Sequence, residues 1–128
     1  MDKTEKCYNT ILVVEDDDDI RNAIVDLLET EGYITESAIN GKDALDKLSQ
    51  IDRPCLVLLD MMMPIMNGRQ FLDTVMKDSR LAPIPILIVS AVADKTNTEG
   101  SVGFLKKPID IDVVLNVVSQ YCQSETST

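Results

Sequence analysis

The sequence predicts a single α/β domain, a doubly wound five-stranded parallel sheet with helices on both faces. Three observations predict this fold. Five short apolar runs alternate with segments of helical spacing, as in βαβ units. The 128 residues suffice for about one domain with one core. The composition, 45% hydrophobic residues but only 4% aromatic ones, is typical of helices packed on a buried sheet.

The first half of the chain contains two strand–helix units. The run Ile11–Val14 is short and β-branched, so we expect a buried strand there. Five acidic residues, 15–19, follow it, of which the last three are typical of helix capping. The helix that begins near the end of this run should stop at Gly32. We then expect a strand at about 33–37 and a short helix around 44–48.

The second half continues the alternation. A continuous apolar run, Cys55–Leu59, predicts another buried strand, and an Asn-Gly pair predicts a turn that opens the next helix. The predicted elements are a strand at Cys55–Leu59, a helix at about Arg69–Lys77, strands at Pro85–Ser90 and Gly103–Lys106, and a helix at Ile111–Tyr121 that Asp110 caps.

Composition excludes several classes of function. The net charge of −10 disfavours direct binding of nucleic acid, and the absence of histidine excludes His-based catalysis. No apolar run suits a signal peptide or a membrane span, so we expect a soluble, cytoplasmic protein without membrane contact. Cys7, Cys55 and Cys122 are few and odd in number, which argues against a disulfide framework and for a reducing compartment.

Polar residues follow four of the predicted strands. Glu15 and Asp16, Asp60, Ser90 and Lys107 stand at or just after the carboxyl ends of strands, where ligands bind in open parallel sheets. Clustered carboxylates repel one another and require a cation, and Mg²⁺ prefers carboxylate, carbonyl and phosphate oxygens. The sequence therefore predicts a magnesium site built on Asp16, Asp60 and a nearby backbone carbonyl.

The same residues suggest chemistry on a phosphoryl group. With its charge offset by the metal ion, Asp60 is an activated carboxylate nucleophile. Ser90 is placed to hydrogen-bond a phosphoryl oxygen, and Lys107 to pair first with Asp60 and then with the phosphoryl group. Pro108 restricts the peptide bond that follows the lysine.

Taken together, the motifs resemble the receiver domains of two-component response regulators, whose minimal form is the chemotaxis response regulator. The resemblance spans about residues 9–122 of one domain, 1–128, with flexible ends. It is carried by motifs at four strand ends, in the expected order. They are Val14–Asp17, Leu58–Pro64 with Asn67-Gly68, Val89–Ala91, and Phe104–Pro108.

The resemblance implies a flavodoxin-like fold with strand order 2-1-3-4-5 and a phosphoacceptor function for Asp60. It implies that the backbone carbonyl of Met62 joins Glu15, Asp16 and Asp60 around Mg²⁺, with Glu15 reaching the ion through water, and that Phe104 is an aromatic switch. The phosphoryl donor would be a phosphohistidine on a sensor histidine kinase or a histidine phosphotransfer domain. The output would be a protein partner in trans, and the domain would catalyse its own phosphorylation and autodephosphorylation.

Two further features concern the surface. Only 17 residues separate Ser90 from Lys107, about one and a half helical turns fewer than in a minimal receiver. The polar segment 94–101 lacks an apolar helical pattern, so the helix expected there should be shortened or irregular. The last helix carries Val113, Val117 and Tyr121 beside its buried stripe, which includes Ile111, and this flank suits a partner or a homodimer.

Other functions fit less well. A dehalogenase-type phosphatase needs an acid two residues after its nucleophile, where this chain has Met62. A flavodoxin-like electron carrier needs a phosphate loop where the acidic run stands, and copper binding by Met61–Met63 is disfavoured beside hard carboxylates. A receiver-like docking module that is not phosphorylated remains the alternative.

Overall fold

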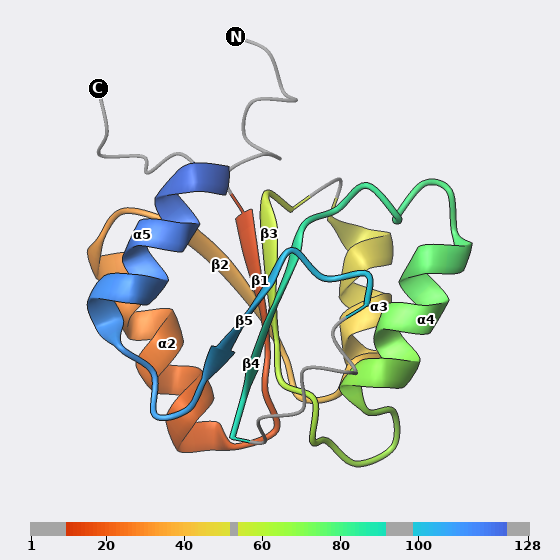
Figure 1. Cartoon of the computed structure of the whole chain (residues 1–128), viewed down its shortest axis with the longest axis horizontal. Helices are drawn as coiled ribbons and strands as arrows, with labels where there is room; N and C mark the ends of the chain where they lie inside the picture. The colour runs from red at the N-terminus through yellow and green to blue at the C-terminus, as the bar shows by residue number, and fades with distance from the viewer. Residues whose placement is uncertain (1–9, 52–53, 92–98, 123–128) are drawn as a thin grey trace, which may run out of the picture.

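The computed structural model describes residues 10–51, 54–91 and 99–122. Five parallel strands form one sheet in the order β2-β1-β3-β4-β5. Helices α2 and α5 cover one face of this sheet, and α3 and α4 cover the other (Figure 1). The elements are β1 (Thr10–Val14), α2 (Asp18–Thr30), β2 (Ile34–Ala38), α3 (Gly41–Gln50), β3 (Leu56–Leu59), α4 (Gly68–Lys77), β4 (Ile86–Ser90), β5 (Gly103–Lys106) and α5 (Ile111–Tyr121). The predicted fold class and strand order are confirmed.

The three central strands are buried on both faces, as their continuous apolar runs predict. Alternate residues of each strand point to opposite faces and join two separate core clusters. One cluster packs against α3 and α4, with Phe71 and Leu72 fully buried. The other packs against α2 and α5, with Leu28 and Val118 fully buried. None of the helices that the structure describes is long and apolar enough to cross a bilayer.

Side-chain caps fix where the helices begin. Asp17 is the N-cap of α2 and accepts a hydrogen bond from the backbone N–H of Ile20 at 3.0 Å. Asn67 and Gln70 form a reciprocal capping box at the start of α4. Asp110 caps α5, as predicted. The capping interpretation of the acidic run is therefore confirmed for Asp17, while the two acids after it occupy the first turn of α2.

The segment between β4 and β5 is described only in part. Residues 99–102 form a turn and no helix, and Arg69 of α4 donates a hydrogen bond to the carbonyl of Glu99 at 3.0 Å. Gly100 has φ +92°, a left-handed conformation that suits glycine. The prediction of a shortened or irregular helix falls mainly on residues 92–98, which lie outside the described residues.

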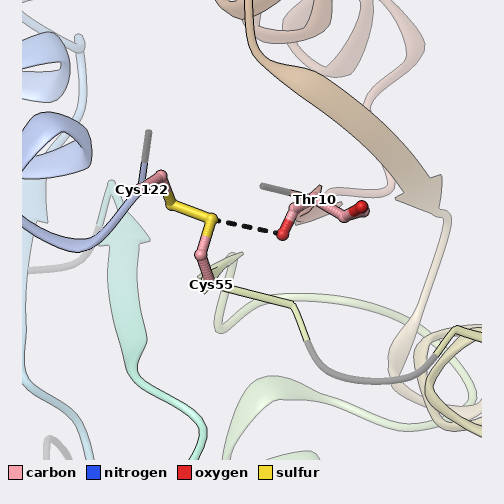
Figure 2. The surroundings of a disulfide bond; sticks show 3 residues. All are labelled: Thr10, Cys55 and Cys122. Carbon is pink, nitrogen blue, oxygen red and sulfur yellow. Dashed lines mark hydrogen bonds between the residues drawn. A yellow bond between two sulfur atoms is a disulfide. The ribbon is translucent and has the colours of Figure 1, made fainter. Parts of the chain in front are cut away.

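The count of cysteines argued against a disulfide framework and did not predict the single disulfide that is present. A disulfide joins Cys55, just before β3, to Cys122, the C-cap of α5 (Figure 2). The two residues are 67 positions apart in sequence, but the sheet order brings the start of β3 and the end of α5 together. An odd number of cysteines argues against a framework of bridges, yet it says nothing about a single pair. The inference of a reducing compartment therefore loses its basis.

The apolar flank predicted on α5 is present, but one residue of the buried stripe predicted beside it is exposed. Val113 and Tyr121 are exposed, and Val117 is half-buried against the core. Ile111, predicted to belong to the buried stripe, is instead 55% exposed because it occupies the first position of the helix, at the rim of the sheet. The exposed apolar residues of the flank are therefore Val113 near the start of α5 and Tyr121 at its end.

Candidate phosphoacceptor site

Backbone hydrogen bonds between neighbouring strands position the two buried acids. The N–H of Asp60 donates to the carbonyl of Val14 at 3.0 Å, which continues the pairing of β3 with β1. The N–H of Glu15 donates to the carbonyl of Ala38 at 3.0 Å, which continues the pairing of β1 with β2. Both side chains are nearly inaccessible, at 5% exposure for Asp60 and 3% for Glu15. The sheet itself therefore sets the spacing of these carboxylates.

The hydroxyl and the ammonium come from the next two strands. Ser90 ends β4 and is 1% exposed, and its backbone carbonyl accepts a hydrogen bond from the N–H of Lys107 at 2.9 Å. Lys107 follows β5 directly, and the bond between it and Pro108 is cis. Ser90 and Lys107, distant in sequence, thus lie at the same edge of the sheet as the acids.

Three carboxylates at this edge form a compact group of hard oxygen donors. Ligand atoms of Glu15, Asp16 and Asp60 all lie within 4.8 Å of one another. Asp16 is exposed, whereas the other two are buried, so one side of the group opens to solvent. Carboxylate oxygens with room for water are the ligands that Mg²⁺ prefers. The donor set therefore fits the magnesium ion predicted from the sequence.

Lys107 provides the positive charge that offsets this group. Its Nζ donates a hydrogen bond to Oε1 of Glu15 at 2.6 Å and lies 3.6 Å from Oδ1 of Asp60. Burial pushes the pKa of Lys107 down, but the hydrogen bond to Glu15 and the charges of both acids outweigh it and hold this pKa above its ordinary value. The ammonium therefore stays charged between the two carboxylates.

Asp60, the candidate phosphoacceptor, has a raised pKa. Burial, and then the negative charge of Glu15, raise the pKa of Asp60 from 3.8 to about 7, although Lys107 and the backbone N–H of Met62 act in the opposite direction. A further cation near Asp60 would favour its charged form. The electrostatics of the metal-free site thus complement a divalent ion.

The loop after Asp60 packs closely on the start of α4. Met62 donates its backbone N–H to Oδ1 of Asp60 at 3.4 Å, while its side chain is 64% exposed. A Cβ at Gly68 would lie 2.8 Å from the carbonyl oxygen of Asp60, so only glycine allows this approach. The Asn67-Gly68 pair therefore both caps α4 and admits the loop that carries Met62.

Phe104 lies near the hydroxyl residue on the same face of the sheet. Its Cα pairs with that of Ile88, two residues before Ser90. Because alternate strand residues share a face, Ser90 lies on the same face as Ile88 and Phe104. Phe104 is half-buried and packs against the core cluster beneath α3 and α4. Phe104 is therefore partly exposed to solvent.

Two contacts of the site were not foreseen from sequence. Glu15 is the nearest carboxylate to Lys107, whereas Asp60 had been expected in that role. Arg21 of α2 donates to the backbone carbonyl of Glu15 at 3.0 Å and so ties the helix to the site. The side chain of Glu15, longer than that of an aspartate, was the available signal for the first contact. Nothing in the pattern of α2 pointed to Arg21.

An apolar groove adjoins the lysine. It has a volume of about 360 Å³ and lies between α2 and the segment that leads from β5 into α5. Its walls are apolar apart from Lys107, which it shares with the acidic group. They include Ile20, Ile24 and Leu27 of α2 with Pro108, Ile109 and Ile111.

Comparison with known proteins identifies the fold and the family of the chain. The family model of the response regulator receiver domain matches residues 11–119. The chain belongs to this family. It is 31% identical over 117 residues to the polar-differentiation response regulator DivK of Brucella anthropi, covering 88% of this chain and 94% of that one. It is 30% identical over 114 residues to PilH of Pseudomonas aeruginosa, covering 85% and 93%.

Solved receiver structures agree. Chemotaxis response regulator CheY4 of Vibrio cholerae matches with a TM-score of 0.79 and 29% identity over 88% of this chain and 97% of that one. TrrA of Thermotoga maritima, solved in complex with Mg²⁺–BeF, matches with a TM-score of 0.78 and 26% identity, covering 88% and 98%. The protein is thus a receiver domain, a phosphoacceptor signalling switch of two-component systems.

Proposed function

We propose that Asp60 accepts a phosphoryl group from a phosphohistidine of a sensor histidine kinase or a histidine phosphotransfer domain, in a reaction that requires Mg²⁺. The observation that carries this proposal is the position of Asp60, a buried carboxylate held between two acids and an ammonium at the edge of a parallel sheet. The charge of Glu15 opposes ionisation of Asp60, a cost that an acid with a purely structural role would not need to bear.

Glu15, Asp16, Asp60 and the backbone carbonyl of Met62 would hold the metal ion. When bound, Mg²⁺ offsets negative charge on the carboxylates and on the phosphoryl oxygens. The ligand atoms of the three acids lie within 4.8 Å of one another, which supports this ligand set. Glu15 would contact the ion through water, since Oε1 of its carboxylate already accepts a hydrogen bond from Lys107.

The chain's own groups carry the transfer. A carboxylate oxygen of Asp60 attacks phosphorus, an O–P bond forms, and the N–P bond of the donor breaks, with its electron pair returning to the imidazole. The ammonium of Lys107, 3.6 Å from Asp60 at rest, follows the negative charge to a phosphoryl oxygen. The hydroxyl of Ser90 donates to another phosphoryl oxygen. Hydrolysis of the same O–P bond by water returns Asp60 to its resting form.

Phosphorylation would reach the surface through Ser90 and Phe104. When Ser90 turns towards the phosphoryl group, it vacates space on the face that Phe104 shares, and the half-buried ring moves inwards. Because β5 is the edge strand of the sheet and α5 follows it, this movement would alter the surface along that edge. A protein partner in trans, or a second copy of this chain, would read that change through the flank of α5.

The phosphohistidine donor would approach along the apolar groove. The groove shares Lys107 with the site and is lined by Ile20 and Ile111, so an apolar helix bound there would bring its histidine towards Asp60. Substituting Ile20 with serine should then slow transfer from a protein donor while leaving transfer from acetyl phosphate unchanged.

Phosphorylation by a small donor tests the proposal. Acetyl phosphate with Mg²⁺ should add one acid-stable, base-labile phosphoryl group per chain, measured by intact mass spectrometry. Omission of Mg²⁺ or the Asp60→Asn substitution should abolish the product. Glu36→Gln, which changes a carboxylate on β2 away from the site, is the matched control and should be labelled like the wild type. Equal labelling of Asp60→Asn would contradict the assignment, and no labelling of the wild type would favour the unphosphorylated docking module.

A further inference from the structure

The disulfide and the phosphoacceptor site lie at opposite ends of the parallel strands. Cys55 precedes β3 and Asp60 follows it, so the five-residue separation along an extended strand amounts to roughly 16 Å. We propose that Cys55 and Cys122 form a reversible thiol–disulfide exchange site, and that its redox state decides whether α5 is covalently fastened to the sheet. This proposal does not depend on the proposed function, because none of its residues belongs to the acidic group.

Packing of α5 on the sheet, rather than the disulfide alone, keeps the two cysteines close. The N–H of Cys55 donates to the carbonyl of Thr10 at 2.9 Å, which fixes Cys55 beside β1. The N–H of Cys122 donates to the carbonyl of Val118 at 2.8 Å, which fixes Cys122 only within α5. Val114 and Val118, in the same core cluster as both cysteines, then return Cys122 to Cys55 in the reduced protein, where the disulfide can re-form.

The sulfur of Cys55 has a partner that suits the reduced state. Its Sγ lies 3.4 Å from the carbonyl oxygen of Thr10 (Figure 2). A disulfide sulfur carries no hydrogen, so this contact becomes an S–H···O hydrogen bond only after reduction. The carbonyl thus gives the thiol a weak hydrogen-bond acceptor in the reduced state.

The surroundings tolerate either state. Both cysteines belong to the core cluster beneath α2 and α5, near Leu56 and Val118, and a free thiol behaves there as a small apolar side chain. The two residues are buried, at 6% and 7% exposure. Small thiols therefore reach the bond when the end of α5 opens locally.

The exchange balances with a thiol as the reductant. A thiolate such as glutathione attacks one sulfur of the bridge, the S–S bond breaks, and the electron pair leaves with the other sulfur, which takes up a proton. A second thiolate then attacks the mixed disulfide, releasing the second cysteine and the oxidised form of the reagent. Glutathione disulfide or a protein disulfide reverses both steps.

Reduction should act on α5 more than on the site. Without the bridge, α5 is held on the sheet by Val114 and Val118, which are buried, and by half-buried neighbours. The end of the helix that carries the exposed Tyr121 should then open more often. The carboxylates stay fixed because strand pairing, not the bridge, positions them.

Thiol trapping in glutathione buffers tests the exchange. The folded wild type should lose the Cys55–Cys122 peptide in reduced glutathione, gain it again in glutathione disulfide, and remain folded by circular dichroism throughout. Cys7→Ser, which lacks the third cysteine of the chain, should behave in the same way. A bond that never forms in oxidised buffer, or that yields only after denaturation, would overturn the proposal.

Hydrogen exchange tests the consequence for the helix. Amides of α5 should exchange about tenfold or more faster in the reduced than in the oxidised wild type, while those of β1 keep their rate. The double variant Cys55→Ser, Cys122→Ser should match the reduced protein in both buffers, and if it does not fold, the reduced wild type alone provides the comparison. Equal α5 exchange in the two redox states would refute the fastening role.

Discussion

Replacing Asp60 by asparagine should stabilise the metal-free protein at alkaline pH but much less at acid pH. The pKa of Asp60 is raised from 3.8 to about 7 by burial and by the charge of Glu15. The folded protein therefore keeps a proton that the unfolded chain releases. Asp60 contributes stability that is complete below about pH 4 and is lost as the pH rises towards 7. Asparagine is neutral throughout and avoids this loss.

The size of the effect follows from the pKa. Stability falls by roughly 1.4 kcal/mol for each pH unit over which the two states differ by one proton. From about pH 5 to pH 7 this amounts to at most about 3 kcal/mol. Other groups titrate too, but they are common to the wild type and to Asp60→Asn. The difference between the two proteins therefore isolates the contribution of Asp60.

Urea unfolding at about pH 5 and pH 8, in chelator, measures that difference. The advantage of Asp60→Asn should grow by about 2–3 kcal/mol between the two pH values. Mg²⁺ at pH 8 should reverse the order, because it stabilises only the protein that keeps the carboxylate. An advantage of the same size at both pH values would refute the electrostatic reasoning about the site.

Three further predictions follow from other parts of the molecule. Lys107→Ala should leave Mg²⁺ affinity intact, whereas Asp16→Ala should weaken it about tenfold or more, as calorimetric titration would show; equal losses would contradict these roles. Reducing the disulfide should cost up to about 4 kcal/mol of unfolding free energy, since it closes a loop with a sequence separation of 67, and an unchanged urea midpoint would argue against this. Val113→Asn should weaken partner or homodimer contact with a stability change of about 0.5 kcal/mol or less, while Val114→Asn, its buried neighbour, should cost about 3 kcal/mol. Similar destabilisation by both valine changes would place Val113 in the core instead.

The strand ends explain why so much of the site was predictable. Apolar runs locate the strands, a parallel sheet aligns their carboxyl ends, and Glu15, Asp60 and Lys107 stand directly after three of them. Their proximity thus follows from topology alone. Their pairing does not, because it depends on side-chain length. Glu15 is one carbon longer than an aspartate and reaches Lys107 first, a preference that only the distances of 2.6 and 3.6 Å reveal.

Other features depend on contacts that sequence patterns do not encode. Cys55 and Cys122 meet because the end of α5 returns to the start of β3, and residue spacing gives no sign of that meeting. Ile111 matches the helical period of the buried stripe but lies at the first position of α5, where it is 55% exposed and lines the apolar groove. Periodicity predicts which side of a helix faces the core, but it does not predict how far along the helix the core extends.

The central claim is that Asp60 is the residue that takes the phosphoryl group. The most direct test is chemical mapping after reaction with acetyl phosphate and Mg²⁺. Borohydride reduces an aspartyl phosphate to homoserine, which tandem mass spectrometry assigns to one position. We expect homoserine at position 60 alone, in an amount that rises with Mg²⁺ concentration. Homoserine at Asp16 or another acid, or a phosphoryl group that borohydride does not remove, would contradict it.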